Sequence, residues 1–393
     1  MWVTEPEVCS IVKMVIMTEN VILIGAFVVA LVMSWVLIPR ILFISFEKKL
    51  FDLPDDRKIH TGAVPRLGGV TFFPVFVFAF MMAFAVLCVV HHDVQSLVTI
   101  DLISESSLLI CGMAIIFLVG VGDDLVGVSP RKKFIAQIIA AAFVPLAGFW
   151  INNFYGLFGV NELPVWVGVP FTIFSIVLIT NAINLIDGLD GLASGLCAVA
   201  LAVISYVFFN DGDWLYLLIT VIMLGIIIPF FMYNVFGATQ RRTKIFLGDT
   251  GSLMLGYVLS FILVRYIYCE HNVVAGGDGR FMIALSLIFV PIFDVLRVMI
   301  VRVRKGVSPF LPDKNHLHHK FLAVRFTNAQ TLCSIIAIDL LHIVMTLVLV
   351  WIDVDINIVF VANILVWITF NQILSRVRAR RKSQNKEREV FIR

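Results

Sequence analysis

Four amide and carboxylate side chains recur every three residues in the segment NAINLIDGLDGL: Asn181, Asn184, Asp187 and Asp190. If the segment is helical, this spacing lines them up on one face of the helix. Gly188 and Gly191 would let the chain break and bring backbone close to a ligand. Oxygen ligands of these types suit a divalent metal and a polar, phosphorylated substrate. The simpler alternative, a helix-ending loop with solvated aspartates, is less favoured because four polar side chains are aligned.

Two further carboxylate motifs lie elsewhere in the chain. GDDLVG places Asp123 beside Asp124, and adjacent carboxylates repel each other unless a cation, such as a metal or Lys133, lies nearby. FLGDTGS places Asp249 just before an apolar segment, with Thr250 and Ser252 as candidate helix N-caps or phosphate donors. Each motif alone also fits a simpler interpretation, interfacial charge for the pair and a helix cap for Asp249. The loop before Asp249 carries one amide and three cations: Asn234, Arg241, Arg242 and Lys244.

Three histidines occur within PDKNHLHHK: His316, His318 and His319. Zinc binding is one interpretation, but no cysteine accompanies them, and zinc-binding histidines on a helix usually lie four residues apart. Given the carboxylates elsewhere, we favour contact with phosphate or sugar. Incidental surface histidines remain the simpler alternative.

The elements that must position these motifs are apolar segments long enough to cross a bilayer. The chain is 60% hydrophobic and 15% charged, with a mean hydropathy of +0.99, whereas soluble globular chains carry about 25% charge. Strands of a membrane barrel would be shorter and would alternate in polarity, so the segments are predicted to be helices. About eleven of them approach the required ~20 residues: 18–45, 67–90, 106–122, 133–150, 165–183, 191–209, 214–232, 251–269, 281–301, 331–351 and 356–374.

The number of segments between the motifs places all of the motifs on one side of the membrane. The same side carries most lysines and arginines, whereas the opposite loops carry acidic residues such as Asp93 and Asp211. The positive-inside rule makes the basic side cytoplasmic. We therefore predict an all-α polytopic membrane protein with about eleven transmembrane helices, an outside N-terminus and a cytoplasmic C-terminus. Residues 1–375 would form one multi-span catalytic domain, and residues 376–393 a basic cytoplasmic tail.

The ninth apolar segment contains Pro291, which removes a backbone hydrogen bond and predicts a kink. Asp294 and Arg297 follow on the same helix face and can pair, which lowers the cost of burying them. Such a kink would open a groove accessible to lipid.

Two other features favour ordinary structural roles. The cysteines are scattered, mostly in apolar segments, and fit small packing residues better than a metal or redox motif. The basic tail lacks interleaved aromatic residues, so an anchor against anionic lipid is favoured and no nucleic-acid role is expected.

Taken together, the motifs resemble the polyprenyl-phosphate N-acetylhexosamine-1-phosphate transferases, which include the phospho-MurNAc-pentapeptide translocases of peptidoglycan synthesis. DGLDGL, LGDTGS and HLHH occur in the order typical of that family, and the likeness runs from about Asp52 to Lys320. The resemblance implies transfer of a sugar-1-phosphate from a UDP-sugar to undecaprenyl phosphate, with release of UMP. It also implies dependence on Mg²⁺, with Mn²⁺ as a candidate substitute, and a site at the cytoplasmic face of a bacterial inner membrane.

The resemblance implies a role for each motif residue. Asp249 matches a metal ligand, and Asp123 and Asp124 match the catalytic pair near the lipid phosphate. Residues expected near nucleotide and sugar are Asn184, Asp187, Asp190 and Asn234. Residues expected near phosphate and sugar are His316, His318, His319, Lys58 and Lys133.

The chain departs from the translocase branch at two places. Gly127 lies where that branch has a lysine, and HLHH replaces three consecutive histidines. With RKIH and PRLGG, this pattern looks more like the branch that starts O-antigen, enterobacterial common antigen or teichoic acid linkage units, whose usual donor is UDP-GlcNAc. Phospho-MurNAc-pentapeptide transfer remains the alternative within the family. A secondary transporter is the alternative from another class, although its ionisable residues would lie near the bilayer midplane. A homodimer is compatible with the sequence.

Overall fold

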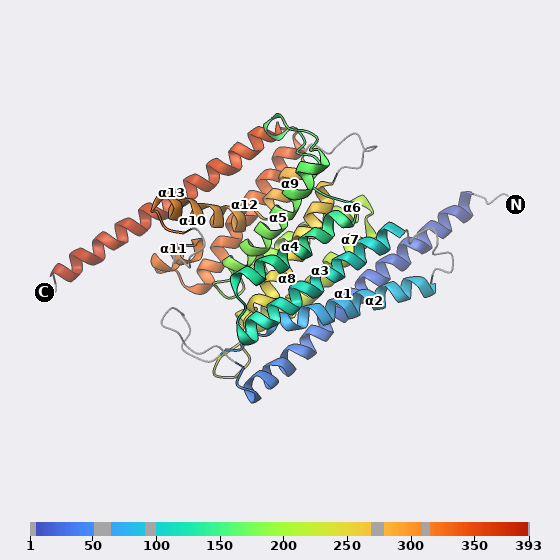
Figure 1. Ribbon diagram of the computed structural model, residues 1–393, viewed down its shortest axis with the longest axis horizontal. Coiled ribbons are helices and arrows are strands. Elements are labelled where there is room, and N and C mark those ends of the chain that lie inside the picture. The colour runs from blue at the N-terminus through green and yellow to red at the C-terminus, as the bar shows by residue number, and fades with distance from the viewer. Residues whose placement is uncertain (1–4, 51–63, 91–99, 269–278, 309–314, 392–393) are drawn as a thin grey trace. The chain divides into compact units, whose positions relative to one another are not determined.

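The computed structural model describes residues 5–50, 64–90, 100–268, 279–308 and 315–391 (Figure 1). Within these ranges the chain is helical, and its one β feature is a bridge between Asn153 and Glu162. The α-helices are α1 (Glu5–Glu47), α2 (Phe72–Val90), α3 (Ile100–Val126), α4 (Pro130–Leu146), α5 (Val165–Ile186), α6 (Leu192–Asp211), α7 (Trp214–Val235), α8 (Gly248–Ile267), α9 (Arg280–Ser286), α10 (Phe289–Arg304), α11 (Leu317–Ala323), α12 (Asn328–Trp351) and α13 (Ile356–Phe391). The 3₁₀ turns are η1 (Gly68–Thr71) and η3 (Leu157–Gly159).

Each predicted apolar segment coincides with one of these helices or with the pair α9–α10. Nine helices in the described ranges are long and apolar enough to cross a membrane, and the bent pair would make a tenth. Helix α4 matches the fourth predicted segment but has 17 residues, fewer than a span usually needs. The prediction of an all-α, multi-pass membrane protein is therefore confirmed for the described residues. The number of crossings and their orientation remain predictions.

The bend in the ninth predicted segment lies one turn before the expected position. Helices α9 and α10 meet at 71°, and the break falls at Leu287 and Ile288, not at Pro291 itself. In a continuous helix, residue 291 would donate its amide to the Leu287 carbonyl, and proline has no amide hydrogen to donate. Pro291 instead lies in the first turn of α10, where the amides have no partner within the helix. The bend thus begins the helix that carries Asp294.

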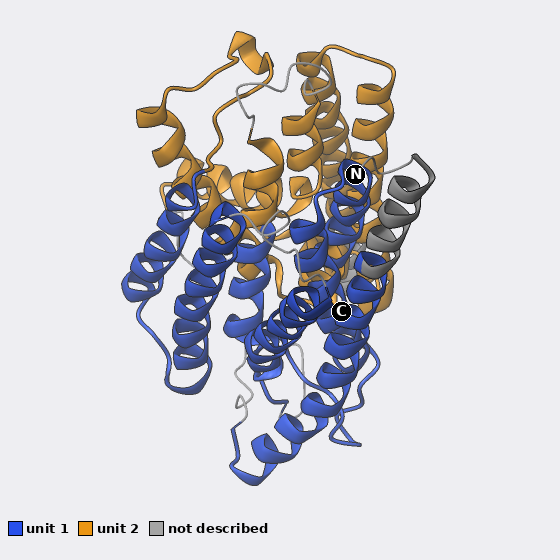
Figure 2. Ribbon diagram, turned by 90° about the vertical axis from the view of Figure 1, so that its right-hand side faces the viewer, with its two compact units in different colours: residues 1–148, 197–259 blue, residues 149–196, 260–393 orange. Residues whose placement is uncertain are grey.

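The first of two compact units comprises residues 1–148 and 197–259 (Figure 2). Within it α1 packs along α2 and α7, and α3 packs along α4. The PRLGG segment pairs through its backbone with the residues that lead into α8. The Phe246 amide donates to the Pro65 carbonyl at 2.8 Å, and the Gly69 amide donates to the Leu247 carbonyl at 2.9 Å. This pairing fixes the approach to Asp249.

The second unit comprises residues 149–196 and 260–393. Within it α10 packs on α5, and α11 packs on α12 and α13. An apolar cluster of Leu157, Met282, Ile356 and Val359 joins η3, α9 and α13. Helix α13 runs unbroken to Phe391, so residues 376–391 of the predicted tail continue a helix. The division of the chain into one catalytic domain and a tail remains a prediction.

Candidate functional site

Lys133 joins two of the predicted carboxylates in the first unit. Its ammonium nitrogen lies 2.8 Å from Asp123 Oδ2 and also donates to Asp249 Oδ2. Asp123 lies near the end of α3, Lys133 in the first turn of α4 and Asp249 in the first turn of α8. Asp123 Oδ1 accepts the Val128 amide at 2.6 Å, which fixes its carboxylate across the turn between α3 and α4. Lys133 is therefore one cation that relieves the repulsion expected for the Asp pair.

Asp124 is engaged differently from its neighbour, because it caps the start of α8. Its Oδ1 accepts the Asp249 amide at 2.8 Å. Its Oδ2 accepts the Thr250 amide at 2.9 Å and the Thr250 hydroxyl at 2.6 Å. A carboxylate at a helix N-terminus satisfies amides that have no partner within the helix and interacts favourably with the helix dipole. The two neighbouring aspartates thus have different partners. Asp123 accepts from the Lys133 ammonium, and Asp124 accepts from the backbone at the start of α8, which carries Asp249.

Gly248 permits this close approach at the start of α8. Its φ is +73°, a left-handed conformation that favours glycine. A Cβ added there would lie 2.0 Å from the Arg66 carbonyl oxygen and 2.6 Å from Asp124 Oδ2. The glycine of GDTGS is therefore required by backbone conformation and space together. Asp123 and Asp249, whose oxygens converge on one ammonium nitrogen, are the described residues of this unit best placed to hold a divalent cation.

Asn234 supports the same segment from α7. Its side chain is buried, and its amide group donates to the Ile245 carbonyl at 2.7 Å. Ile245 precedes the Phe246–Leu247 stretch that pairs with PRLGG. Asn234 thus helps to hold the loop that leads to Asp249, and its expected contact with nucleotide stays a prediction.

In the second unit, the NAINLIDGLDGL segment is helical only in its first half. Helix α5 ends at Ile186, so Asn181 and Asn184 lie on the helix whereas Asp187 and Asp190 lie beyond it. The Gly188 amide donates to the Ile186 carbonyl at 2.7 Å, a tight turn centred on Asp187. The single four-residue stripe considered from the spacing is therefore wrong for the last two positions, because the chain turns where glycine permits it.

Gly188 brings this turn against the histidine motif. A Cβ added at Gly188 would lie 2.5 Å from His318 Nε2, so any larger residue would collide with the imidazole. His318 is buried, and its Nδ1 has no hydrogen-bond partner among the described residues. Burial, reinforced by the neighbouring His319 and His316, lowers the pKa of His318 to about 3. His318 is accordingly neutral near pH 7, so it acts by shape and hydrogen bonding rather than by charge.

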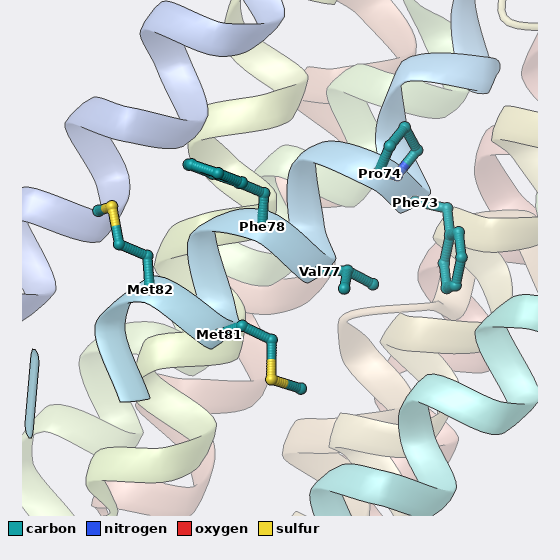
Figure 3. Close-up of a pocket in the computed structure, with 6 residues that line it drawn as sticks. All are labelled: Phe73, Pro74, Val77, Phe78, Met81 and Met82. Atoms are coloured by element: carbon teal, nitrogen blue, oxygen red, sulfur yellow. The ribbon is translucent and has the colours of Figure 1, made fainter. Parts of the chain in front are cut away.

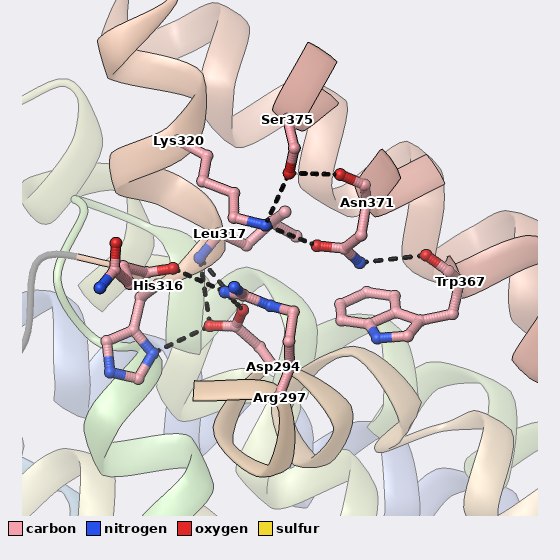
Figure 4. Close-up of polar contacts among 9 residues, drawn as sticks. Asp294, Arg297, His316, Leu317, Lys320, Trp367, Asn371 and Ser375 are labelled. Atoms are coloured by element: carbon pink, nitrogen blue, oxygen red, sulfur yellow. Dashed lines mark hydrogen bonds and ion pairs between the residues drawn. The ribbon is translucent and has the colours of Figure 1, made fainter. Parts of the chain in front are cut away.

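Lys320 ties the histidine helix to α13. Its ammonium donates to Asn371 Oδ1 at 3.1 Å and to Ser375 Oγ at 3.5 Å (Figure 4). Burial, together with the positive charges of Arg297 and Arg378, lowers the pKa of Lys320 to about 8. No motif in the sequence assigns a role to Lys320, although Asn371 and Ser375, four residues apart at the end of an apolar segment, are a pattern that could have indicated a partner for it.

The structure thus brings the predicted residues together in two groups, one in each unit. The first contains Asp123, Asp124, Lys133 and Asp249, and the second joins the Asp187–Asp190 turn to His316, His318 and His319 through Gly188. Lys58 lies outside the described residues. The roles assigned to these side chains remain predictions.

An apolar hollow of about 650 Å³ lies along α2, lined by Phe73, Pro74, Val77, Phe78, Met81 and Met82 (Figure 3). These residues form one stripe of a helix that is apolar enough to cross a membrane. The lining carries no ionisable side chain, so the hollow offers no group for acid–base or metal chemistry.

The middle of the chain matches a known protein family. Residues 106–267, which include Asp123, Lys133 and Asp249, match the family described as Glycosyl transferase family 4. The chain is 29% identical over 360 residues to a probable undecaprenyl-phosphate N-acetylglucosaminyl 1-phosphate transferase of Bacillus subtilis, covering 90% of this chain and 92% of that protein. It is 30% identical over 289 residues to the undecaprenyl-phosphate alpha-N-acetylglucosaminyl 1-phosphate transferase of Salmonella typhi, covering 73% of each.

These matches show that the chain belongs to glycosyl transferase family 4, which agrees with the resemblance found in its motifs. The protein is a transferase of this family and a multi-pass membrane protein.

Proposed function

We propose that the protein transfers N-acetylglucosamine-1-phosphate from UDP-GlcNAc to undecaprenyl phosphate and releases UMP. The reaction would be the first membrane step of a cell-surface glycan pathway, at the cytoplasmic face of a bacterial inner membrane. Family membership and the names of relatives that match most of the chain support the reaction class. The observation that carries the proposal is the convergence of Asp123 and Asp249 on one cation, Lys133, beside a backbone held by Asp124.

The donor set fits Mg²⁺. Mg²⁺ in proteins is usually held by one or two carboxylates, with substrate phosphates and water completing its shell. Asp249 and Asp123 offer the carboxylate oxygens that the Lys133 ammonium contacts in this structure, and Mg²⁺ would displace the ammonium from them, whereas both oxygens of Asp124 accept hydrogen bonds from α8. When bound, Mg²⁺ would offset charge on the diphosphate and on the leaving phosphate.

The transfer exchanges one phosphorus–oxygen bond for another. An oxygen of the lipid phosphate forms a bond to the β-phosphorus of the UDP-sugar, the bond from that phosphorus to the bridging oxygen breaks, and UMP leaves with that oxygen. Both reactants are anions, so positioning and neutralisation of charge are the main tasks of the protein. Lys133 places a positive charge beside Asp123 and Asp249, and the Asp123 carboxylate orients the ammonium by accepting a hydrogen bond from it.

A large contribution from general-base catalysis is not required. A phosphate monoester is already mostly ionised near neutral pH, because its second pKa is about 6. Asp123 would act chiefly by orienting the Lys133 ammonium, which would attract the lipid phosphate, and Asp124 by holding Asp249 in place. The three hydrogen bonds that Asp124 accepts from α8 support this division of tasks, and the expectation that both members of the pair act on the substrate stays a prediction.

The second group of residues offers partners for the nucleotide sugar. Asn184, Asp187 and Asp190 supply amide and carboxylate groups at the end of α5, and the histidine motif lies against that turn at Gly188. UDP-GlcNAc is proposed as the donor because the relatives are named for N-acetylglucosaminyl 1-phosphate transfer.

The test is turnover by purified protein in detergent. UDP-GlcNAc, undecaprenyl phosphate and Mg²⁺ should yield UMP together with lipid-linked GlcNAc-phosphate, and a chelator should stop both. Omission of the lipid phosphate is the control for simple hydrolysis of the nucleotide sugar. A protein that releases no UMP with any member of a panel of UDP-sugars, yet moves a solute across vesicles, would be a transporter and would overturn the proposal.

A further inference from the structure

Asp294 is a carboxylate whose hydrogen bonds converge on the first histidine of the motif. It lies on α10 and is 1% exposed. Its Oδ2 lies 2.9 Å from His316 Nδ1, and its Oδ1 accepts from Arg297 Nη2 at 2.6 Å (Figure 4). The Leu317 amide lies 3.1 Å and 3.2 Å from the two oxygens. One buried carboxylate therefore holds both the ring of His316 and the peptide that follows it.

This arrangement fixes the tautomer of His316. A carboxylate paired with a guanidinium only accepts hydrogen bonds, so Nδ1 of His316 must carry the hydrogen. Nε2 is the nitrogen left for another partner, and in Figure 4 it lies on the side of the ring away from Asp294. A neutral His316 would accept at Nε2, and a protonated one would donate there to an anionic oxygen.

The charges around this carboxylate are mainly positive. Arg297 contacts Asp294 directly and also donates to the Asn315 carbonyl at 2.6 Å. Lys320 interacts electrostatically with Asp294, Arg297 and Arg378. His318 and His319 lie on the same short helix, with the rings of His316 and His318 parallel and 6.1 Å apart. Three cationic side chains, those of Arg297, Lys320 and Arg378, outnumber Asp294, and this balance favours an anionic ligand such as a diphosphate.

We propose that Asp294 is a positioning residue for the transfer reaction, acting through His316. It fixes the imidazole so that Nε2, which carries a hydrogen when the ring is protonated, donates to a phosphate oxygen of the nucleotide sugar. The inference rests on the proposed function, since it needs a phosphorylated donor. The structural alternative is that Asp294 only neutralises Arg297 and caps α11. In that case loss of Asp294 would destabilise the fold to the same extent with and without the His316 side chain.

A double-mutant cycle separates these two roles. Asp294→Asn keeps the shape of the side chain but removes its charge, and His316→Ala removes the group through which Asp294 is proposed to act. In the wild-type background Asp294→Asn should lower kcat by about ten-fold or more, as loss of a group that orients a catalytic-site histidine does elsewhere. In the His316→Ala background the same change should lower the residual rate by less than about two-fold.

Asp339 provides a matched control. It is also a buried carboxylate of the second unit, on α12, and it interacts with the Val290 backbone amide of α10 and not with His316. Asp339→Asn should change the rate by the same factor in both backgrounds. If Asp294→Asn fails to fold because Arg297 is left unpaired, the cycle is repeated with Asp294→Asn and Arg297→Gln together, which removes both charges of the pair.

The outcomes distinguish the inference from the function on which it rests. Equal losses for Asp294→Asn with and without His316, in variants whose melting temperatures match their parents, would overturn the positioning role while leaving the transferase intact. Absence of UMP release from the wild type itself would overturn the proposed function. Strong non-additivity for Asp294 with additivity for Asp339 is the result expected.

Discussion

Asp124, at the end of α3, accepts hydrogen bonds from both the backbone amide and the hydroxyl of Thr250, at 2.9 Å and 2.6 Å. The two residues are 126 positions apart in sequence. Their contact fixes the first turn of α8, and that turn carries Asp249. The sequence predicts that Asp124 forms a catalytic pair with Asp123. In the structure Asp124 instead holds the backbone that carries another carboxylate, Asp249.

Thr250→Val should weaken this support while keeping the shape of the side chain. Thr250 is fully buried, and the valine would leave Asp124 with one hydrogen bond fewer. A hydrogen bond to a charged group contributes about 2 kcal/mol, so we expect a lower melting temperature and lower turnover. Thr250→Ser is the control, because it keeps the hydroxyl and should stay near the wild type in both measurements. Equal turnover for the valine and serine variants would contradict the supporting role.

Asp249→Ala should abolish transfer without unfolding the protein. Asp249 is on the first turn of α8 and contributes one of the two oxygens that converge on Lys133. Its removal would leave Asp123 alone to hold a divalent cation. Turnover across a Mg²⁺ titration and the rise in melting temperature on adding Mg²⁺ should both be lost. Asp211→Ala, at the end of α6, is the control. Near-wild-type turnover of Asp249→Ala at limiting Mg²⁺ would refute the metal assignment.

Local sequence patterns could predict the helices and the motif residues. Apolar length alone located every predicted segment on a helix or on the α9–α10 pair, because spanning the hydrocarbon core sets a minimum length. The adjacent carboxylates in GDDLVG also predict a cation nearby, and in the structure the Lys133 ammonium contacts Asp123. These features depend on composition and short spacing, which a single chain displays directly.

Contacts between distant segments could not be predicted in the same way. Nothing in the local pattern distinguishes Asp124, which caps α8, from Asp123, which contacts Lys133. Helical spacing predicts the pairing of Asp294 with Arg297, but it does not predict the hydrogen bond between Asp294 and His316, 22 positions away. Such contacts depend on how helices pack, and packing is not encoded in periodicity. The polar spacing does not predict the end of α5 at Ile186, because the three-residue spacing of polar side chains continues beyond the end of the helix.

The stability of the protein should fall as pH drops below about 6.5, in part because of His318. The pKa of His318 is about 3 in the folded chain against a usual value of 6.5, so below pH 6.5 the unfolded chain binds a proton that the folded chain does not. Stability is lost as pH falls from that value towards 3, by up to about 1.4 kcal/mol per pH unit. Melting temperatures at pH 7, 6 and 5 should fall less steeply for His318→Gln than for the wild type. Parallel curves would argue against a buried, neutral His318.

Lys133 and His318 are predicted to face the cytoplasm, as the C-terminal tail does, and Asp211 to face the other side. Cysteines placed one at a time on a cysteine-free background test this in intact cells. Because His318 is buried, the exposed Lys132 and Arg304 are the positions to replace on the predicted inner side, with Asp211 on the outer side. A reagent that does not cross membranes should label position 211 alone. Labelling of positions 132 and 304 with none at 211 would reverse the topology.

The protein is expected to discriminate between two donor nucleotide sugars. UDP-GlcNAc should be used and UDP-MurNAc-pentapeptide refused, because HLHH and Gly127 depart from the translocase pattern and PRLGG looks more like the GlcNAc branch. A pocket shaped for GlcNAc need not admit a lactyl-peptide arm, and a site that hydrogen-bonds a substrate hydroxyl strongly rejects analogues that lack it.

The motif residues are expected to contact groups that both donors share, so they do not select between the two. Competition between the two nucleotides at equal concentration, with the lipid product identified by mass, measures the preference directly. GlcNAc-phosphate on the lipid is the expected product. Efficient turnover of the pentapeptide donor, with UDP-GlcNAc inert, would place this chain with the peptidoglycan enzymes, and the departures at Gly127 and His316–His319 would then have no bearing on donor choice.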